Sequence, residues 1–252
     1  MALTDNLISY WKLDEASGNA LDAHSTNELT DTNSVAAGTG IINGARDFEA
    51  DSNHEFDIAS NASLQIADID VSYTFTCWIN LESTGTRIVF RKRDSTNVGG
   101  SLEYMLRIAT GTPTMFWGDS GAGFGSLSVG SAVSTGVWAF IVCGYDASTD
   151  KFFISLDNGT MQESAAVTNQ TLAGANAFGL GATTDNAEDF DGLIDEVGFW
   201  KRRLTADEIT SLYNSGAGLS YDNFAGGSAG AALLILNPNI RGGLSGLRTG
   251  IN

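Results

Sequence analysis

The chain has 252 residues, 42% of them hydrophobic, so it can bury the core of one large domain or of two small ones. Its net charge of −17 argues against a general nucleic-acid binder, because no basic stripe exists to displace counterions, and it disfavours an anionic membrane surface. The amino terminus lacks the basic and apolar regions of a secretion signal, and no run of about 18 apolar residues predicts a membrane span.

Short apolar strands alternate with polar turns through the first half of the chain. Residues 14–33 are polar and small, and they predict a long loop. The clearest strand is 73–81, where Phe75, Cys77 and Ile79 face one way and the residues between them face the other. The other strands predicted in this half are 7–13, 44–48, 87–93 and 102–109, with shorter alternation over 56–66.

The second half continues this pattern. Residues 118–136 hold six glycines and little apolar periodicity, so they predict no strand. Cys77 and Cys143 both fall in apolar strands, where two buried free thiols and one disulfide are the alternatives. The strands predicted in this half are 114–117, 137–145, 151–156 and 178–181.

Residues 190–200 predict a buried strand that two acids interrupt. Regular alternation places Asp195 on the face that carries Val197 and Phe199, and it places Glu196 on the opposite face. A carboxylate in the middle of such a strand costs free energy unless it is paired or bound to a cation.

A short helix is predicted directly after this strand. Thr205 is the candidate N-cap, and Glu208 completes a capping box. Leu204 and Ile209 can form the hydrophobic staple, and Gly216 is expected to supply the left-handed residue at the helix end. About a dozen short strands and one helix are typical of an all-β, two-sheet antiparallel sandwich or jelly roll with an extended tail.

The chain resembles the laminin-G-like (LamGL) jelly rolls of the concanavalin A-like lectin/glucanase superfamily. The matching pieces cover about residues 7–216, and we predict a jelly-roll domain over residues 1–222 followed by an extended glycine-rich tail over 223–252. The matching pieces occur in the family's order: YWKLDEASGNALDAHS at 10–25, INGARDFEAD at 42–51, YTFTCWINL at 73–81, VWAFIVCGYDASTDKFFISLDNG at 137–159 and DGLIDEVGFWKRRLTADEITSLYNSG at 191–216.

The resemblance also implies one structural calcium ion, between the end of the first strand and the last strand. Asp195 matches the side-chain ligand, and the turn at Gly44 matches a backbone carbonyl ligand. Calcium accepts six to eight oxygen ligands, so carbonyls and water suit it. The alternative is that Asp195 only hydrogen-bonds the backbone or a nearby arginine such as Arg46. Asp14 and Asp22 are weaker candidates for the metal.

No catalytic pattern is visible. The glucanase branch of the superfamily uses two carboxylates on one strand in the form ExDxxE, because two acids must flank a glycosidic bond. The nearest acidic cluster, Glu188, Asp189 and Asp191, lies in a turn without alternating apolar residues. The chain is therefore predicted not to be an enzyme.

The family and the aromatic residues suggest a glycan site. Lectin-type sites stack sugars on aromatic rings and use short polar side chains or calcium for the hydroxyl groups. Trp117 and Phe124 flank a polar glycine-rich turn that contains Asp119, so these three residues are the candidate ligand-binding set. The alternative for Trp117 is packing in the core.

The last residues, 223–252, favour a different role. They hold seven glycines, two arginines and no acid, and they cannot build a core of their own. The tail is predicted to bind a neighbouring subunit through strand addition or groove binding, and the alternative is that it folds back on its own sandwich. Its candidate contact residues are Leu233, Leu234, Ile235, Leu236, Arg241 and Arg248.

These features predict a non-enzymatic structural or decorating protein of a virion-like, phage-type assembly that displays the jelly roll outward. The missing export signal agrees, because a virion leaves its host by lysis. The expected location is a virion or an extracellular surface assembly, and the expected partners are neighbouring subunits and a surface glycan, without nucleic acid or membrane insertion. The alternative is a soluble, calcium-dependent carbohydrate-binding module.

Overall fold

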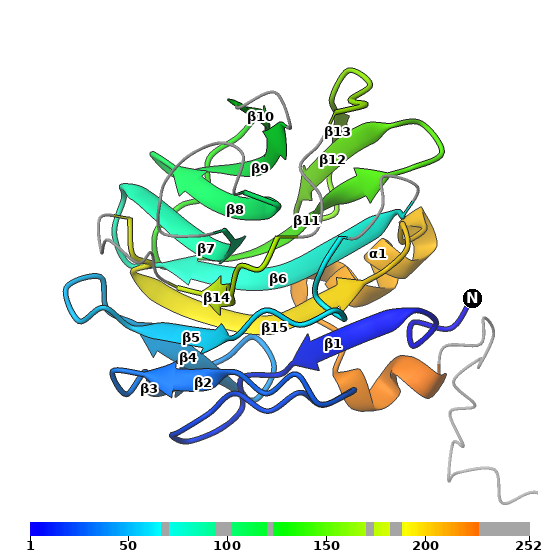
Figure 1. Cartoon of the computed structure of the whole chain (residues 1–252). Coiled ribbons are helices and arrows are strands. Elements are labelled where there is room, and N and C mark those ends of the chain that lie inside the picture. Colours follow the sequence, from blue (N-terminus) through cyan, green and yellow to red (C-terminus); the bar gives the residue numbers. More distant parts are fainter. Residues whose placement is uncertain (67–70, 94–101, 120–122, 170–173, 182–187, 227–252) are drawn as a thin grey trace, which may run out of the picture.

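The structure is a computed structural model, and it describes residues 1–66, 71–93, 102–119, 123–169, 174–181 and 188–226. Over these residues the chain forms two antiparallel sheets that pack face to face (Figure 1). The predicted all-β jelly-roll sandwich with one short helix is confirmed. Within the described ranges no helix has the length and apolar character needed to cross a membrane.

The eight-stranded sheet has the order β13-β12-β11-β6-β15-β4-β3, and β1 pairs with β15. Its strands are β1 (Leu7–Trp11), β3 (Ala36–Thr39), β4 (Gly44–Phe48), β6 (Tyr73–Leu81), β11 (Trp138–Asp146), β12 (Lys151–Leu156), β13 (Gln162–Glu163) and β15 (Gly192–Trp200). The seven-stranded sheet has the order β10-β9-β8-β7-β14-β5-β2. Its strands are β2 (Thr30–Thr32), β5 (Glu55–Ile58), β7 (Thr86–Lys92), β8 (Tyr104–Ala109), β9 (Thr112–Asp119), β10 (Gly123–Ser128) and β14 (Phe178–Leu180).

The main core fills the space between the two sheets. Phe75 lies at its centre and stacks on Phe199 of β15, with ring centroids 4.3 Å apart. From the opposite sheet Phe90 and Tyr104 approach the same ring to 4.5 and 4.8 Å. Each such buried ring contributes about 1.5–3 kcal/mol by leaving water. The predicted inward face of β6 is confirmed, because Phe75, Cys77 and Ile79 all belong to this core.

Both cysteines are buried free thiols, so of the two alternatives, free thiols and a disulfide, the structure shows the free thiols. Cys77 lies opposite Ile141, and Cys143 lies opposite Phe75, on the neighbouring strands β6 and β11. Burial raises the pKa of both thiols, so neither is an activated nucleophile.

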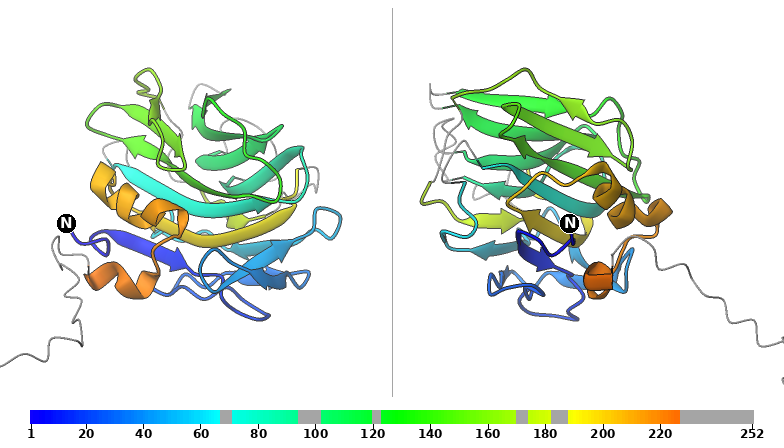
Figure 2. Two further views of the ribbon diagram at one scale, coloured as in Figure 1. Left: turned by 180° about the vertical axis from the view of Figure 1, so that it is seen from behind. Right: turned by 90° about the vertical axis from the view of Figure 1, so that its right-hand side faces the viewer.

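A second core lies on the outer face of the eight-stranded sheet, under α1 (Ala206–Tyr213) and the 3-10 helices η2 (Asn214–Gly216) and η3 (Tyr221–Gly226). Figure 2 shows the helices on this outer side. The capping box of Thr205 and Glu208 is present, and Leu204 and Ile209 are both buried in this second core. The helix ends earlier than predicted, because Asn214 and not Gly216 is the left-handed cap residue, with φ 46°.

The second core also binds the amino terminus to the end of the domain. Trp200 donates from Nε1 to the Leu3 carbonyl at 2.6 Å. Arg202 is paired with Glu208 and donates to the carbonyls of Asp5 and Ala2 at 2.7 and 3.2 Å. Phe224, which falls in the predicted tail, is buried against the ring of Tyr10 at 4.9 Å. The packed body therefore extends at least to Phe224.

The prediction that residues 118–136 hold no strand is wrong for β10. Its sequence GFGSLS has little apolar periodicity, but the strand pairs with β9 along its whole length. Glycine is required at one position: a Cβ on Gly125 would stand 2.2 Å from the Trp117 ring. The strand thus leaves room for a core tryptophan, which propensity alone does not reveal.

A fully buried ion pair joins β7 to the segment before β8. Lys92 Nζ lies 2.6 Å from Oε1 of Glu103, and both side chains are inaccessible to solvent. Lys92 also donates to the carbonyls of Gly174 and Asn176 at 3.1 and 2.8 Å, and the Gly174 amide donates to Glu103 at 2.8 Å. The pair thereby anchors the segment that leads into β14.

Glu103→Gln should lower the free energy of unfolding by about 3 kcal/mol, because it leaves the Lys92 charge buried without its counter-charge. Chemical denaturation measures this value. The matched control is Glu188→Gln, which removes the half-buried pair with Arg107 and should cost less than about 1 kcal/mol. An equal loss in both variants would contradict the anchoring role of the buried pair.

Candidate functional site

A β-bulge in β15 changes the side-chain alternation that the sequence predicts. Asp195 lies opposite Trp78 and Gly198 lies opposite Thr76, so one extra residue is inserted into β15 between these pairs. Glu196 takes up the insertion with φ 50°. The predicted alternation, with Glu196 facing away from Asp195, is therefore wrong.

The bulge lies where β15 changes partner along one edge. Its first half pairs with β4, up to Ile194 opposite Arg46, and its second half pairs with β1, from Val197 opposite Trp11. Asp195 and Glu196 occupy the junction between these two partners. The segments that follow β1 and precede β4 converge there, which brings Asp14 and Gly44 to the same place: the Gly44 amide donates to Asp14 Oδ1 at 2.9 Å.

Asp195 is fully buried and is held by one of its two oxygens. Oδ2 accepts hydrogen bonds from the amides of Ile41 and Ile42 at 2.8 and 3.1 Å. Within the described ranges Oδ1 has no hydrogen-bond partner. Burial raises the pKa of Asp195 to about 8, and nearby Asp14 adds to this increase, although the backbone amides of Ile42, Ile41 and Glu196 oppose it. Arg46 does not pair with Asp195; it pairs with Asp31 at 3.2 Å.

Glu196 is the functional candidate that sequence reasoning missed. Its side chain is 2% exposed, and neither carboxylate oxygen accepts a well-formed hydrogen bond from the described residues. The Tyr10 side chain interacts with it, and burial raises the pKa of Glu196 to about 8, with further increases from Asp195 and Asp14. The sequence does show a glutamate next to an aspartate in an apolar strand. Regular alternation, however, predicts the wrong face of the sheet for Glu196.

The backbone packs tightly beside Asp195, and this requires glycine at position 40. A Cβ at Gly40 would stand 1.9 Å from the Gly44 carbonyl oxygen and 2.5 Å from Asp195 Oδ2. A carboxylate oxygen and a carbonyl oxygen therefore lie close together here, and Asp195 Oδ1 has no hydrogen-bond partner among the described residues. Such an all-oxygen set suits a hard cation such as calcium. Asp22, in contrast, is occupied by the amides of Tyr10, His24 and Ser25.

The candidate glycan residues are separated by the structure. Trp117 is 5% exposed and stacks on Phe152 in the main core, with centroids 3.9 Å apart, which matches the packing alternative. Asp119 lies at the end of β9 and accepts a hydrogen bond from Asn169 at 2.6 Å. Phe124 is the member that faces solvent, with 64% of its surface exposed.

Phe124 forms an aromatic patch with Phe116 on the outer face of the seven-stranded sheet. The two rings lie 5.7 Å apart, and the guanidinium of Arg107 lies 4.4 Å from the Phe116 ring. Arg107 also pairs with Glu188 at 3.2 Å. Ser126 and Ser128 are exposed on the same strand, two and four positions after Phe124, so their side chains share its face. The Ser128 hydroxyl is hydrogen-bonded to the Thr114 hydroxyl at 2.9 Å.

The other half of this outer face is charged. Glu55 of β5 accepts a hydrogen bond from Arg91 of β7 at 2.7 Å, across the central strand β14. Gly179 of β14 permits this contact, because a Cβ there would lie 2.5 Å from the Glu55 carboxylate. Burial raises the pKa of Glu55 to about 7, although Arg91 opposes the increase. Sequence reasoning did not single out this pair.

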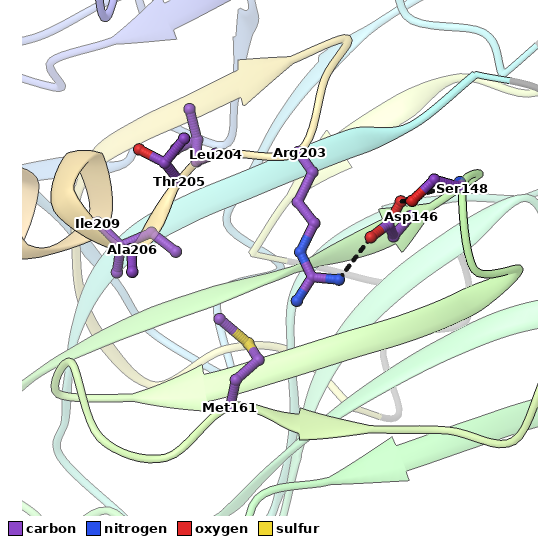
Figure 3. A pocket seen from close by; sticks show the side chains of 8 residues that line it. All are labelled: Asp146, Ser148, Met161, Arg203, Leu204, Thr205, Ala206 and Ile209. Carbon is purple, nitrogen blue, oxygen red and sulfur yellow. Dashed lines mark hydrogen bonds and ion pairs between the residues drawn. The ribbon is translucent and has the colours of Figure 1, made fainter.

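A pocket of about 430 Å³ opens beside the amino-terminal end of α1 (Figure 3). Arg203 points across it and pairs with Asp146 at 2.7 Å. The same guanidinium pairs with Glu163 at 2.9 Å and covers the Phe153 ring at 4.6 Å. Its charge is thus already balanced, and the pocket presents no uncompensated charge to a ligand. The lining residues are Asp146, Ser148, Met161, Arg203, Leu204, Thr205, Ala206 and Ile209.

A further acidic group forms at the opposite end of β4. The carboxylates of Asp47, Glu49 and Glu82 lie within 4.8 Å of one another, and the two glutamates are exposed. The predicted tail contacts Leu233, Leu234, Ile235, Leu236, Arg241 and Arg248 lie outside the described residues.

Solved structures similar to this chain include the binding domains of bacterial toxins. The binding domain of Paraclostridial Mosquitocidal Protein 1 matches 85% of this chain and 53% of its own, with 14% identity and a TM-score of 0.68. The binding domain of botulinum neurotoxin DC, solved with rat synaptotagmin II, matches 88% of this chain and 54% of its own, with 10% identity and a TM-score of 0.65. This chain therefore spans about half the length of the toxin binding domains.

Domain 4 of AbnA, a GH43 extracellular arabinanase from Geobacillus stearothermophilus solved with arabinotriose, matches over 98% of its length and 85% of this chain. The identity is 15% and the TM-score 0.63, so this likeness, like the others, shows the fold. No curated protein sequence gives a match. A family model, described as the concanavalin A-like lectin/glucanases superfamily, matches residues 51–210. The chain therefore belongs to the laminin-G-like branch of the concanavalin A-like lectin/glucanase superfamily.

Proposed function

We propose that this chain is a binding module without catalytic activity, and that it recognises a carbohydrate through the outer face of the seven-stranded sheet. The observation that carries the proposal is the exposed ring of Phe124 beside Phe116. Sugar rings stack on such aromatic faces, and the hydroxyl groups of Ser126 and Ser128 can exchange hydrogen bonds with those of a sugar. The fold supports the same role, since similar folds occur in an arabinotriose-bound domain and in toxin binding domains.

Phe124→Ala should weaken glycan binding by roughly tenfold, or about 1.4 kcal/mol, because it removes the exposed stacking surface. A glycan array identifies the best sugar, with arabinotriose included as one probe, and calorimetry measures its affinity. Val137→Ala is the matched control, because Val137 is also an exposed apolar residue, at 55%, but lies in a different segment. Unchanged affinity in Phe124→Ala, or no sugar bound in the presence of calcium, would contradict the proposal.

We propose that Asp195 and the Gly44 carbonyl hold a structural calcium ion. The unpaired Asp195 Oδ1, and the Gly44 carbonyl oxygen that lies close to Asp195 Oδ2 beside Gly40, support this assignment. The ion would neutralise buried carboxylate charge at the junction of β1, β4 and β15. It would thereby stabilise the sandwich without contacting the aromatic patch of Phe124.

Metal analysis should find about one calcium per chain, and EDTA should lower the melting temperature by about 5–10 °C through loss of the binding free energy. Asp195→Asn should abolish this response. Asp22→Asn should keep it, because the Asp22 carboxylate is occupied by backbone amides. If the purified protein contains no calcium and its melting temperature does not change when EDTA is added, the proposed ion is ruled out.

A second proposal concerns the tail, which is basic while the body is strongly acidic. We propose that it anchors the chain to neighbouring subunits of a virion-like assembly, so that the jelly roll is displayed outward. All 30 acidic residues precede residue 223, and the segment that follows has two arginines and no acid. Such a tail can attach to an acidic neighbour by charge complementarity as well as by its apolar run.

Deletion of residues 227–252 should leave the melting temperature unchanged and convert large assemblies of the full chain into monomers, as measured by light scattering. Deletion from residue 223 is a sharper comparison, because it also removes the buried Phe224 and should cost about 3 kcal/mol. A large loss of stability in the shorter deletion would instead support a tail that folds back on its own sandwich.

A further inference from the structure

We propose that Arg107 makes the aromatic patch of Phe124 and Phe116 selective for sugars that carry a carboxylate, such as a uronic acid or a sialic acid. The inference rests on the carbohydrate role proposed above, and it names the chemical class of the ligand. It concerns a cation beside the patch, which the stacking of a sugar on Phe124 does not involve.

The first step is that Arg107 lies on the same face as the patch. Its neighbours in β8, Leu106 and Ile108, enter the main core, so the Arg107 side chain points to the outer face of the seven-stranded sheet. Thr114 of β9 lies opposite Arg107, and Ser128 of β10 lies opposite Thr114. These three polar residues form a row beside the aromatic pair, and the row spans two strand spacings, or about 10 Å.

The second step is the contact between the cation and the patch. The guanidinium carbon of Arg107 lies 4.4 Å from the centre of the Phe116 ring, and this ring lies 5.7 Å from the Phe124 ring. Attraction between the guanidinium and the aromatic face stabilises this position. Phe116 therefore contacts both the exposed ring and the cation, and a sugar chain that stacks on Phe124 has a positive charge close to its path.

The third step is the unused hydrogen-bonding capacity of Arg107. A guanidinium presents several N–H donors in a rigid fork that matches a carboxylate. Nη1 donates to Glu188 Oε1 at 3.2 Å, while Nε has no partner among the described residues. The side chains of Arg107 and Glu188 keep 27% and 30% of their surface exposed, so solvent screens their pairing and its free energy is small. A carboxylate on a ligand can therefore replace Glu188 at little cost.

The fourth step is the charge of the surroundings. The chain has a net charge of −17, so an acidic sugar is repelled except where a cation lies within contact distance. Arg91, on the same outer face, does not offer such a contact, because its side chain is 4% exposed and pairs with Glu55 at 2.7 Å. Arg107 is the more accessible of these two cations, and it is the one that touches the aromatic patch.

The test measures binding of two acidic probes, trigalacturonate and sialyllactose, by calorimetry with calcium present. Each acid is compared with its methyl ester, which keeps the sugar rings and removes the charge. The wild type should bind one of the acids roughly tenfold more tightly than its ester, and that acid identifies the source of the carboxylate. Arg107→Gln should abolish this preference. Glu188→Gln should raise the affinity for the acid by about two- to fivefold, because it removes the competing carboxylate.

The matched control is Arg203→Gln. Arg203 is also a partly exposed arginine that pairs with carboxylates and covers a phenylalanine ring, but it lies beside α1 on the other sheet. This variant should bind each acid and each ester as the wild type does. Melting temperatures of all variants show whether a change in affinity comes from unfolding.

Equal affinity for acid and ester in the wild type, with both weakened in Phe124→Ala, would overturn the role of Arg107 and leave the carbohydrate proposal intact. Binding of neither pair, while the glycan array finds a neutral sugar, would do the same. Absence of any bound sugar would overturn both proposals. A preference for the acid that survives in Arg107→Gln would assign the carboxylate to another cation. If Arg107→Gln does not fold, Glu188→Gln decides, since an unchanged affinity for the acid would overturn the inference.

Discussion

The central strand β15 pairs with three strands. The bulge at Asp195 and Glu196 allows this pairing while the side chains that follow it stay in the core. One edge pairs with β6 throughout, while the other is divided between β4 and β1. Without the extra residue, the side chains after Asp195 would change faces, and Val197 and Phe199 would leave the main core. The bulge keeps both residues buried and directs two consecutive acids to the outer face. Burial of these acids is thus a consequence of how the sheet is closed.

The two outer faces of the sandwich differ in composition. On the eight-stranded sheet the helices cover a second hydrophobic core, and Asp195 and Glu196 are buried at the junction of β1 and β4. On the seven-stranded sheet Phe124 remains exposed beside Phe116, and the Glu55–Arg91 pair lies farther along the same face. The proposed calcium site and the proposed glycan-binding face are therefore on opposite sides of the sandwich. Substitutions on the proposed binding face would then leave the closure of the fold undisturbed.

Sequence periodicity predicted the elements whose neighbours are regular. The inward face of β6 and the capping box at Thr205 follow from local rules, and both are present. Three features depended on partners distant in sequence. β10 exists because it pairs with β9 around the Trp117 ring, the face of Glu196 is set by the register against β6, and the helix ends at Asn214 before Gly216. The candidate glycan residues are close in sequence, but strand pairing turned Trp117 into the core and left the ring of Phe124 exposed.

The contacts of Arg202 and Phe224 hold the amino-terminal residues next to the carboxyl-terminal end of the described body. Arg202 holds the backbone of Ala2 and Asp5, while Phe224 packs on Tyr10 of the first strand. Among the described residues, the amino terminus and η3 consequently lie in one region of the packed body, as Figure 2 shows. A domain with this exit geometry can be inserted into a loop of another protein or repeated on a common stem without threading a connection across either sheet. Mechanical load applied through both ends would first meet the contact of Phe224 with Tyr10 and the contacts of Arg202 with Ala2 and Asp5, before it reached the strands of the sandwich.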